Sequence, residues 1–276
     1  MVLETMIELS DFYHITLVHL KGIMKHADWS PITHAHDHFE LCVHIKGHLQ
    51  IFAEGKSYLL SGGEIRLYGA GEMHCGVLKT EEEMEWYQIN IPAAFLSHPD
   101  GALLTRIFRE RSFGTGNVIL SERKQEIVMM LRSAFALWES GAQTASSYAK
   151  AAVIGVLSLL HADENRKAGH VGKRLPALEK ILDVIGQDFA ELDSVEALSA
   201  RTHFSVSYIN KLFRLHVGVS PYQFLLDKKL TEAKKALKAG ASVTDAARIG
   251  GFHDYSGFIT LFRKRFGVTP LQYQKL

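Results

Sequence analysis

The spacing of apolar and polar residues divides the first two thirds of the chain into two stretches. Between about residues 12 and 97, short apolar runs are separated by glycine turns, and Leu41, Val43 and Ile45 alternate with polar neighbours at a period of two. This pattern predicts short β-strands arranged as a barrel or sandwich. Between about residues 101 and 162 the apolar period becomes helical, which predicts an amphipathic helical pair.

The two predicted helices each carry one apolar stripe, and Gly141 with the polar segment 143–147 separates them. A pair of this kind can pack within its own domain or form the seam of a dimer, and the sequence leaves both open. The polar segment 163–174 contains two glycines and predicts a linker. The stripes consist of Ile127, Leu131, Ala134, Leu137 and Trp138, and of Val153, Val156, Leu157 and Leu160.

From residue 176 to the end, the pattern predicts short helices. Pro176 suits the first position of a helix, and Asp193 followed by Glu196 predicts a capping box that opens the next helix. Residues 204–224 recur 49 positions later. Phe213, Arg214, Gly218, Val219, Pro221 and Gln223 return as Phe262, Arg263, Gly267, Val268, Pro270 and Gln272.

Each copy of this repeat reads as a turn, an amphipathic helix, a glycine stop and a proline restart. The repeat therefore predicts a duplicated helix–turn–helix, whose two helices can enter two successive major grooves of DNA. The charge distribution agrees with this interpretation. Residues 1–165 hold 13 Lys and Arg against 20 Asp and Glu, whereas residues 166–276 hold 18 against 10. A basic half of this kind is typical of a domain that meets phosphates.

Composition sets the remaining limits. Only two cysteines, Cys42 and Cys75, favour a reducing compartment without a disulfide framework. The N-terminus has no basic region followed by a long apolar run, so a signal peptide is not expected. The longest apolar stretch, near 151–160, is too short for a membrane span. We therefore expect a cytoplasmic protein without membrane contact.

The helical period predicts which residues of each repeat face outward. In the first copy Ile209, Leu212 and Phe213 are expected in the core, and in the second Phe258, Leu261 and Phe262. The opposite face then carries Ser207, Asn210, Lys211 and Arg214 in the first copy, and Ser256, Ile259, Thr260 and Arg263 in the second. Asn can pair with adenine and Lys or Arg with guanine, whereas simple solvation is the alternative for each of these residues. Ile259 suits either a thymine methyl contact or partial burial.

Residues 176–276 resemble the DNA-binding domain of the AraC/XylS family of bacterial transcription regulators. The resemblance is carried by Val243–Phe252 (VTDAARIGGF), Phe258, Phe262–Pro270 (FRKRFGVTP) and Tyr273. It implies recognition helices at about 206–216 and 255–265, joined by a long helix at Pro221–Lys238. The sequence departs from the family pattern at Lys229, where Arg is usual, and at His203, where Gly is common. The implied DNA-binding residues are Ser207, Tyr208, Asn210, Lys211, Arg214, Lys228, Lys229, Tyr255, Ser256, Gly257, Ile259, Thr260, Arg263 and Lys264.

A second motif lies in the N-terminal half, where His34, His36 and Glu40 form H-x-H-x3-E and His74 closes G-x5-G-A-G-x2-H. Both segments resemble the motifs of the cupin barrel, in which three His and one Glu converge on a metal. His and carboxylate ligands suit a divalent ion such as Zn, Mn, Fe or Ni. In the alternative interpretation, the same four residues bind a small effector without metal.

These observations predict a two-domain α+β protein. Residues 1–165 would form a cupin-like β-barrel with a following helical pair, for effector binding and dimerisation, and residues 166–276 an all-α domain with two helix–turn–helix units. The predicted function is that of a non-enzymatic transcription regulator of the AraC type. It would bind double-stranded promoter or operator DNA as a homodimer, respond to a sugar or related metabolite, and contact RNA polymerase, as the resemblance implies. The alternative is a cupin metalloenzyme, such as a sugar isomerase or dioxygenase, with an appended DNA-binding domain. Residues 1–20, the helical pair and the linker are candidates for coupling effector to DNA.

Overall fold

The computed structural model describes residues 2–25, 34–54, 56–78, 80–163, 166–168 and 175–274. The chain folds into two compact units, residues 1–30 with 36–174 and residues 31–35 with 175–276. The division falls later than the predicted domain end at residue 165. The reason is that Lys167 and Ala168 form β10, which pairs with β9 in the first unit. The predicted linker lies largely outside the described residues, at 164–165 and 169–174.

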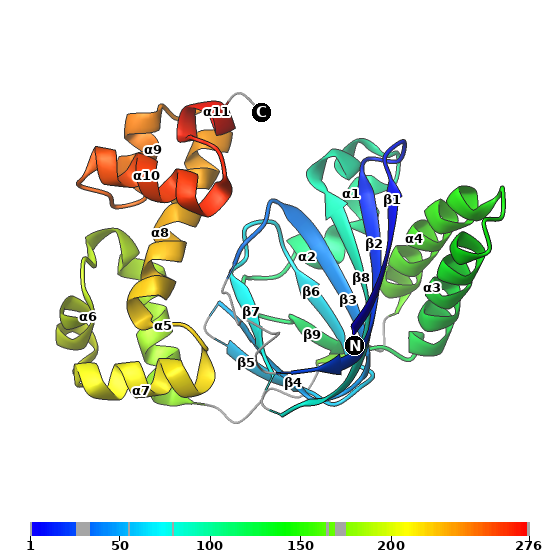
Figure 1. The fold of residues 1–276 in the computed structure, drawn as a ribbon, viewed down its shortest axis with the longest axis horizontal. Helices are drawn as coiled ribbons and strands as arrows, with labels where there is room; N and C mark the ends of the chain where they lie inside the picture. The colour runs from blue at the N-terminus through cyan, green and yellow to red at the C-terminus, as the bar shows by residue number, and fades with distance from the viewer. Residues whose placement is uncertain are drawn as a thin grey trace. The chain divides into compact units, whose positions relative to one another are not determined.

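The first unit is built on two antiparallel sheets (Figure 1). Among the described residues, one sheet has seven strands in the order β1-β2-β8-β3-β6-β9-β10 and the other has three in the order β5-β4-β7. Gly62 and Gly63, with φ angles of 112° and 110°, turn the chain between β5 and β6, as the sequence predicts. The strands are β1 (Val2–Leu9), β2 (Ile15–Met24), β3 (His38–Lys46), β4 (Leu49–Ala53), β5 (Lys56–Leu60), β6 (Ile65–Tyr68), β7 (His74–Val77), β8 (Glu82–Pro92), β9 (Val118–Leu120) and β10 (Lys167–Ala168).

The central strands β3 and β6 of the larger sheet are buried on both faces. The outer face of the sheet packs Leu41, Val43 and Ile89 against helices α3 (Lys124–Glu139) and α4 (Ala145–Ala162). Its inner face places Tyr68 and Trp86 against the smaller sheet. The shorter helices η1 (Ala93–Ser97), α1 (Gly101–Leu104) and α2 (Arg106–Arg109) connect β8 to β9. The predicted strand around Leu41 is therefore present, and its positions Glu40, Cys42 and His44 are buried, whereas Lys46 at its end is exposed.

The predicted helical pair is internal core. Leu131 and Leu157 are both 0% exposed and belong to the cluster that covers the sheet. Helix α4 has the length and apolar composition of a membrane span, which the sequence pattern at residues 151–160 did not indicate. Its residues Val153, Val156 and Leu160 are also 0% exposed against this core, so burial within the domain accounts for its apolar character.

The N-terminal segment is part of the larger sheet. Strand β1 pairs with β2 along its full length, and β2 pairs with β8 from Thr16 to Met24. Asp11, between the two strands, forms an ion pair with Lys150 of α4 at 2.5 Å. The described part of residues 1–20, one of the predicted candidates for coupling the effector to DNA, is thus hydrogen bonded into the sheet.

The second unit consists of helices, as predicted (Figure 1). Its recognition and connecting helices begin and end within a residue of the predicted limits. Pro176 occupies the first turn of α5, which fits its missing amide donor. The helices are α5 (Pro176–Asp188), η2 (Phe189–Glu191), α6 (Val195–Thr202), α7 (Val206–His216), α8 (Pro221–Lys238), α9 (Val243–Ile249), α10 (Tyr255–Phe266) and α11 (Pro270–Gln274).

Serine side chains begin four of these helices. Ser205 accepts a hydrogen bond from the amide of Tyr208 at α7, and Ser220 accepts one from Gln223 at α8. The predicted capping box at Asp193 is wrong by one residue, because Ser194 is the residue that accepts from the amide of Ala197. Ser242 has the same role at α9.

Candidate DNA-binding surface and ligand-binding interior

Helix α7 presents one apolar and one polar face. Ile209, Leu212 and Phe213 are buried, as the helical period predicts. Ser207, Asn210, Lys211 and Arg214 are brought together and line a surface groove of about 400 Å³ with residues 218–220, where α8 begins. Tyr208 is also exposed, at 42%. The groove combines hydroxyl, amide and cationic groups with a helix N-terminus, the groups that contact base edges and phosphates.

Helix α10 offers a sparser polar face. Tyr255, Ser256, Thr260, Arg263 and Lys264 are exposed, whereas Gly257 and Ile259 are only partly exposed. Ile259 packs against the apolar cluster of Phe258 and Phe262, so partial burial explains its apolar side chain. The hydroxyl of Thr260 donates to the carbonyl of Ser256, within the helix, at 3.0 Å.

Two of the predicted DNA-binding residues are buried. Lys229 is 6% exposed; its ammonium donates to the carbonyl of Gly251 at 2.8 Å and pairs with Asp193 at 3.2 Å. Lys228 is 8% exposed and pairs with Glu232 at 3.3 Å. The contacts of Lys229 hold α8 to the turns before α6 and α10. Burial takes both lysines off the surface on which DNA contact was predicted, and we do not include them in the proposed interface.

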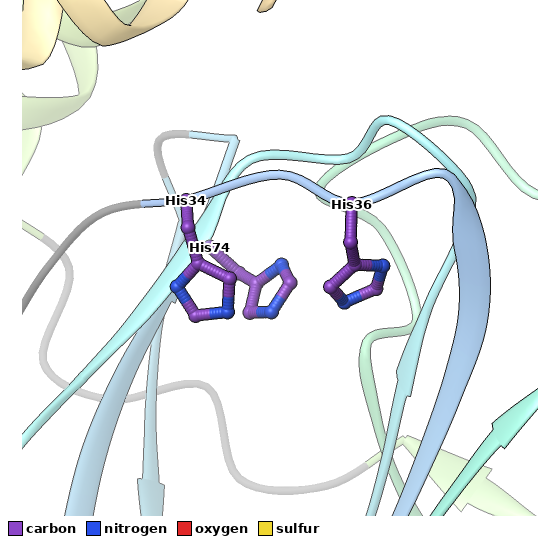
Figure 2. A group of neighbouring side chains, drawn as sticks. All are labelled: His34, His36 and His74. Atoms are coloured by element: carbon purple, nitrogen blue, oxygen red, sulfur yellow. The ribbon is translucent and has the colours of Figure 1, made fainter. Parts of the chain in front are cut away.

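The histidines of the N-terminal motif converge. Ring nitrogens of His34, His36 and His74 lie within 4.8 Å of one another, and Figure 2 shows the three rings facing a common space. A second group, His36, His38 and Glu40, meets the same limit. His36 precedes β3, Glu40 lies in β3 and His74 begins β7, so these three residues come from both sheets. The structure adds His38, which the predicted set left out.

Backbone hydrogen bonds orient two of these rings. Nδ1 of His36 bonds the carbonyl of His38, and Nδ1 of His74 bonds the carbonyl of Glu72, both at 2.9 Å. A carbonyl only accepts, so each Nδ1 carries a proton, and Nε2 is the nitrogen that faces Glu40 or a ligand. Nε2 of His36 lies 3.1 Å from Oε2 of Glu40. This orientation by backbone carbonyls is the one found in metal-binding histidines, so the residues fit a divalent ion.

Electrostatics keep Glu40 ionised. Burial by itself raises the pKa of this carboxyl, but the hydrogen bond with His36 and the charges of His74 and Arg66 hold its pKa below the usual value. Oε2 also accepts from Nε2 of Gln88 at 3.2 Å. A buried carboxylate with histidine neighbours can bind a cation or accept hydrogen bonds from a polar ligand.

Most of the buried polar residues lie outside the predicted histidine and glutamate motif. Arg66 is 6% exposed and stacks over the Trp86 ring at 5.7 Å. Its Nε is buried and has no acceptor among the described residues. Gln88 also donates to Asn90 at 2.8 Å. These residues alternate with core residues along β6 and β8, and this alternation is the signal that could have revealed them.

The fold and its two sites define a two-domain protein with an enclosed polar interior in one unit and a helix–turn–helix pair in the other. Comparison with known proteins agrees with this class. The AraC-like ligand binding domain matches residues 22–157, and a helix-turn-helix domain matches residues 198–276. The two matches do not overlap and together cover most of the chain, which belongs to the AraC/XylS family.

The similar proteins are named as regulators. The chain is 33% identical over 114 residues to the HTH-type transcriptional activator RhaS of Escherichia fergusonii, spanning 41% of this chain and 38% of the relative. It is 30% identical over 105 residues to a probable transcriptional regulator, LumQ of Photobacterium leiognathi, spanning 37% of this chain and 42% of that protein. The match thus covers about two fifths of each of these relatives. The thermoregulatory protein LcrF of Yersinia pestis is 25% identical over 267 residues, spanning 89% of this chain and 93% of the relative.

Among solved structures, ToxT from Vibrio cholerae covers 99% of this chain and 96% of its own at 14% identity, with a TM-score of 0.38. The AraC-like transcriptional activator CuxR covers 90% of this chain and 85% of its own at 14% identity, with a TM-score of 0.41. The reported relatives are named as regulators, so the enzyme alternative has no support from them.

Proposed function

We propose that the protein binds operator DNA through α7 and α10, and that a small molecule in the interior of the first unit controls this binding. The groove on α7 is the observation that supports the first part. One face of α7 carries four polar side chains next to the capped start of α8, namely Ser207, Asn210, Lys211 and Arg214. Two such helices in one unit would enter successive major grooves on one side of the duplex.

Salt dependence tests the DNA-binding part. Contacts from Lys211, Arg214, Arg263 and Lys264 to phosphates displace counterions, so affinity for operator DNA should fall steeply as salt rises. Footprinting should show protection at positions separated by about 10 base pairs, one helical turn. Affinity that stays flat between low and physiological salt, or a single short protected patch per protomer, would contradict the proposed interface.

The interior of the first unit supports the second part. His36, Glu40 and His74 together with Arg66 offer largely buried charged and polar groups, and Trp86 offers an apolar ring. A sugar or related metabolite has hydroxyl groups that can bind the charged and polar side chains, and a carbon face that can pack on the Trp86 ring. Zn, Mn, Fe or Ni would be held by His34, His36, His74 and Glu40, and would there supply a charge that orients ligand oxygens.

Substitution in the interior tests the effector site. His36→Ala or His74→Ala should abolish the effect of the ligand on DNA binding and leave DNA binding without ligand intact. His48→Ala is the matched control, because His48 is exposed and pairs with Glu82 at 3.0 Å away from the interior. Metal content is measured on the same proteins; loss of bound metal in His74→Ala but not in His48→Ala supports the metal. A His74→Ala protein that still responds fully to its effector would place sensing elsewhere.

Assembly and location complete the proposal. A homodimer suits the paired half-sites that such proteins read, and α3 offers Met129, which is 68% exposed, on its outer face. Met129→Glu should dissociate the dimer in light-scattering measurements, whereas a charge at the buried Leu131 or Leu157 should unfold the unit. RNA polymerase is the proposed partner on the promoter, and the cytoplasm the proposed compartment.

A further inference from the structure

A cavity lies in the first unit, separate from the histidine cluster. Its volume is about 660 Å³, and it is formed where α2, β9, the end of α4 and the start of β10 meet. Its floor is apolar, with Leu67 1% exposed and Ile119 6% exposed. Neither His36, Glu40 nor His74 lines it.

Arginines surround this apolar floor. Arg106, Arg111 and Arg166 line the cavity together with His161, and Glu110 is the acidic residue among its lining. Arg106 is paired with Glu110. Arg111 is paired with the buried Glu72. Arg166 donates to backbone carbonyls and pairs with no carboxylate among the described residues.

The position of Arg166 makes it suitable for an anion. Nη1 of Arg166 donates to the carbonyls of Leu160 and Asp163 at 3.2 and 3.1 Å, which fixes its guanidinium at the end of α4. Both terminal nitrogens of Arg111 donate to Glu72 and to the carbonyls of Thr115 and Leu67, so this side chain forms part of the cavity wall. Arg166 is therefore the group to which an anion can bind.

We propose that this cavity binds a small organic anion, with its carboxylate or phosphate at Arg166 and its apolar part on Leu67 and Ile119. The volume is in the usual range for small-molecule sites. A carboxylate and a phosphate ester share the negatively charged oxygens that guanidinium groups bind, and the test separates them.

The position of the cavity gives the ligand a regulatory effect. Ile119 lies in β9 and pairs in register with Ala168 of β10, the last described strand before the second unit begins. A ligand that contacts both Ile119 and Arg166 stabilises the pairing of β9 with β10, and so holds the start of the connection to the DNA-binding unit. This consequence rests on the proposed function, whereas the binding does not.

The test uses the full-length protein with three probes of one shape: 1-naphthoate, 1-naphthyl phosphate and the neutral 1-naphthalenemethanol. Dissociation constants are measured by calorimetry for the wild type and for the variants. Both anions, or one of them, should bind at least about 10-fold more tightly than the alcohol, as expected for a charge-assisted contact. Arg166→Gln should weaken the preferred anion by about 10-fold. Glu110→Gln should tighten it several-fold, because it removes a negative charge and releases Arg106.

Arg109→Gln is the matched control, since Arg109 lies on the same helix as Arg106 but does not line the cavity. His74→Ala should leave binding of the probe unchanged. Equal binding of the alcohol, unchanged affinity in both Arg166→Gln and Glu110→Gln, or loss of binding in His74→Ala overturns the proposal. Amide hydrogen exchange in residues 118–120 and 166–168 tests the regulatory consequence. Binding of the anion should slow this exchange in the wild type. These outcomes do not depend on DNA binding, so failure of the site and failure of the proposed function are distinguishable.

Discussion

The two units place their polar side chains on opposite sides of their cores. In the first unit Glu40, His44 and Arg66 point inward and are at most 7% exposed. In the second unit Asn210 and Lys211 project from a helix whose opposite face is buried. A small molecule is recognised by surrounding it with donors and acceptors, whereas DNA is recognised by side chains that reach into a groove. From this difference we expect the stability of the first unit to depend on the protonation of its buried side chains. The stability of the second unit should depend on the close packing of its backbone.

Gly251→Ala carries the largest expected effect, in the second unit. Gly251 has a φ of 71°, and a Cβ there would lie 2.5 Å from both Cα and the carbonyl oxygen of Ala190. Backbone atoms cannot move aside as a flexible side chain can, so we expect the free energy of unfolding of the second unit to fall by about 3 kcal/mol or more. Far-UV circular dichroism during urea unfolding measures it. Trp86 and Trp138 lie in the first unit and residues 175–276 contain no Trp, so tryptophan fluorescence should not shift.

Gly240→Ala is the control for this experiment. Gly240 has a φ of 92°, but an added Cβ there would have no heavy atom within 4 Å. The free energy of unfolding of Gly240→Ala should fall by only about 1 kcal/mol, because backbone strain is the sole cost of this substitution. Equal losses in the two alanine variants would mean that the close approach to Ala190 does not limit the stability of this unit.

Protonation of His44 gives the next effect, in the first unit. Burial, reinforced by the charge of Arg66, lowers the pKa of His44 from 6.5 to about 4. The unfolded chain therefore binds the proton first, so stability is fully present above pH 6.5 and is lost as the pH falls towards 4. The loss amounts to about 3 kcal/mol. Tryptophan fluorescence during urea unfolding at a series of pH values measures it.

His44→Gln should remove most of this pH dependence while keeping a donor for the carbonyl of Gly47, which the ring contacts at 2.8 Å. An imidazole that titrates near pH 6.5 by NMR in the folded wild type would show that the interior of this unit is open to water. The contrast between the two units would then be lost.

The two recognition helices are compared by alanine substitution. Asn210→Ala or Lys211→Ala should each reduce operator affinity by about 1–3 kcal/mol and relax preference at one base pair. Thr260→Ala should cost less, because the face of α10 carries fewer donors and Ile259 is partly packed in the core. Binding to a set of single-base operator variants measures both quantities. A larger effect at Thr260 than at Asn210 would reverse the assignment of the stronger reading helix.

The second unit could be predicted in detail from its sequence, because each repeat carries its own turn, apolar stripe and helix start. The buried triplet of Ile209, Leu212 and Phe213 follows from helical spacing alone. Lys229 could not be placed in this way. Its burial depends on Asp193 and on the carbonyl of Gly251, which are far from it in sequence and meet it only in the folded unit.

The first unit could be predicted only in outline. A period of two reveals strands such as β3, but it does not show whether the polar face meets water or a second sheet. Glu40 and His74 were found because they lie in a spaced motif. Arg66 and Trp86 belong to no local motif, and their alternation with core residues indicates a strand face without showing what covers that face. The anion cavity is formed by residues from segments on both sides of α3 and α4, so spacing along the chain does not reveal it.

The smallest expected effect concerns the turn of the first helix–turn–helix. His203 ends α6 with a φ of 61° and a ψ of 23°, a left-handed conformation that suits glycine better than a residue with a Cβ. His203→Gly should therefore stabilise the second unit by about 0.5–1 kcal/mol. Far-UV circular dichroism during urea unfolding measures the gain.

His253→Gly is the control in the corresponding turn of the second helix–turn–helix. His253 is also exposed, but it is not among the described residues with positive φ. Glycine at this position adds conformational freedom to the unfolded chain without relieving strain in the folded one. The free energy of unfolding of this variant should therefore fall by about a few tenths of a kcal/mol or more. A gain in stability for His203→Gly together with a loss for His253→Gly would show that the first repeat tolerates a strained turn. The second repeat avoids this strain because it has Gly251 at the corresponding place. Destabilisation in both would mean that the side chain of His203 contributes more than its backbone strain costs.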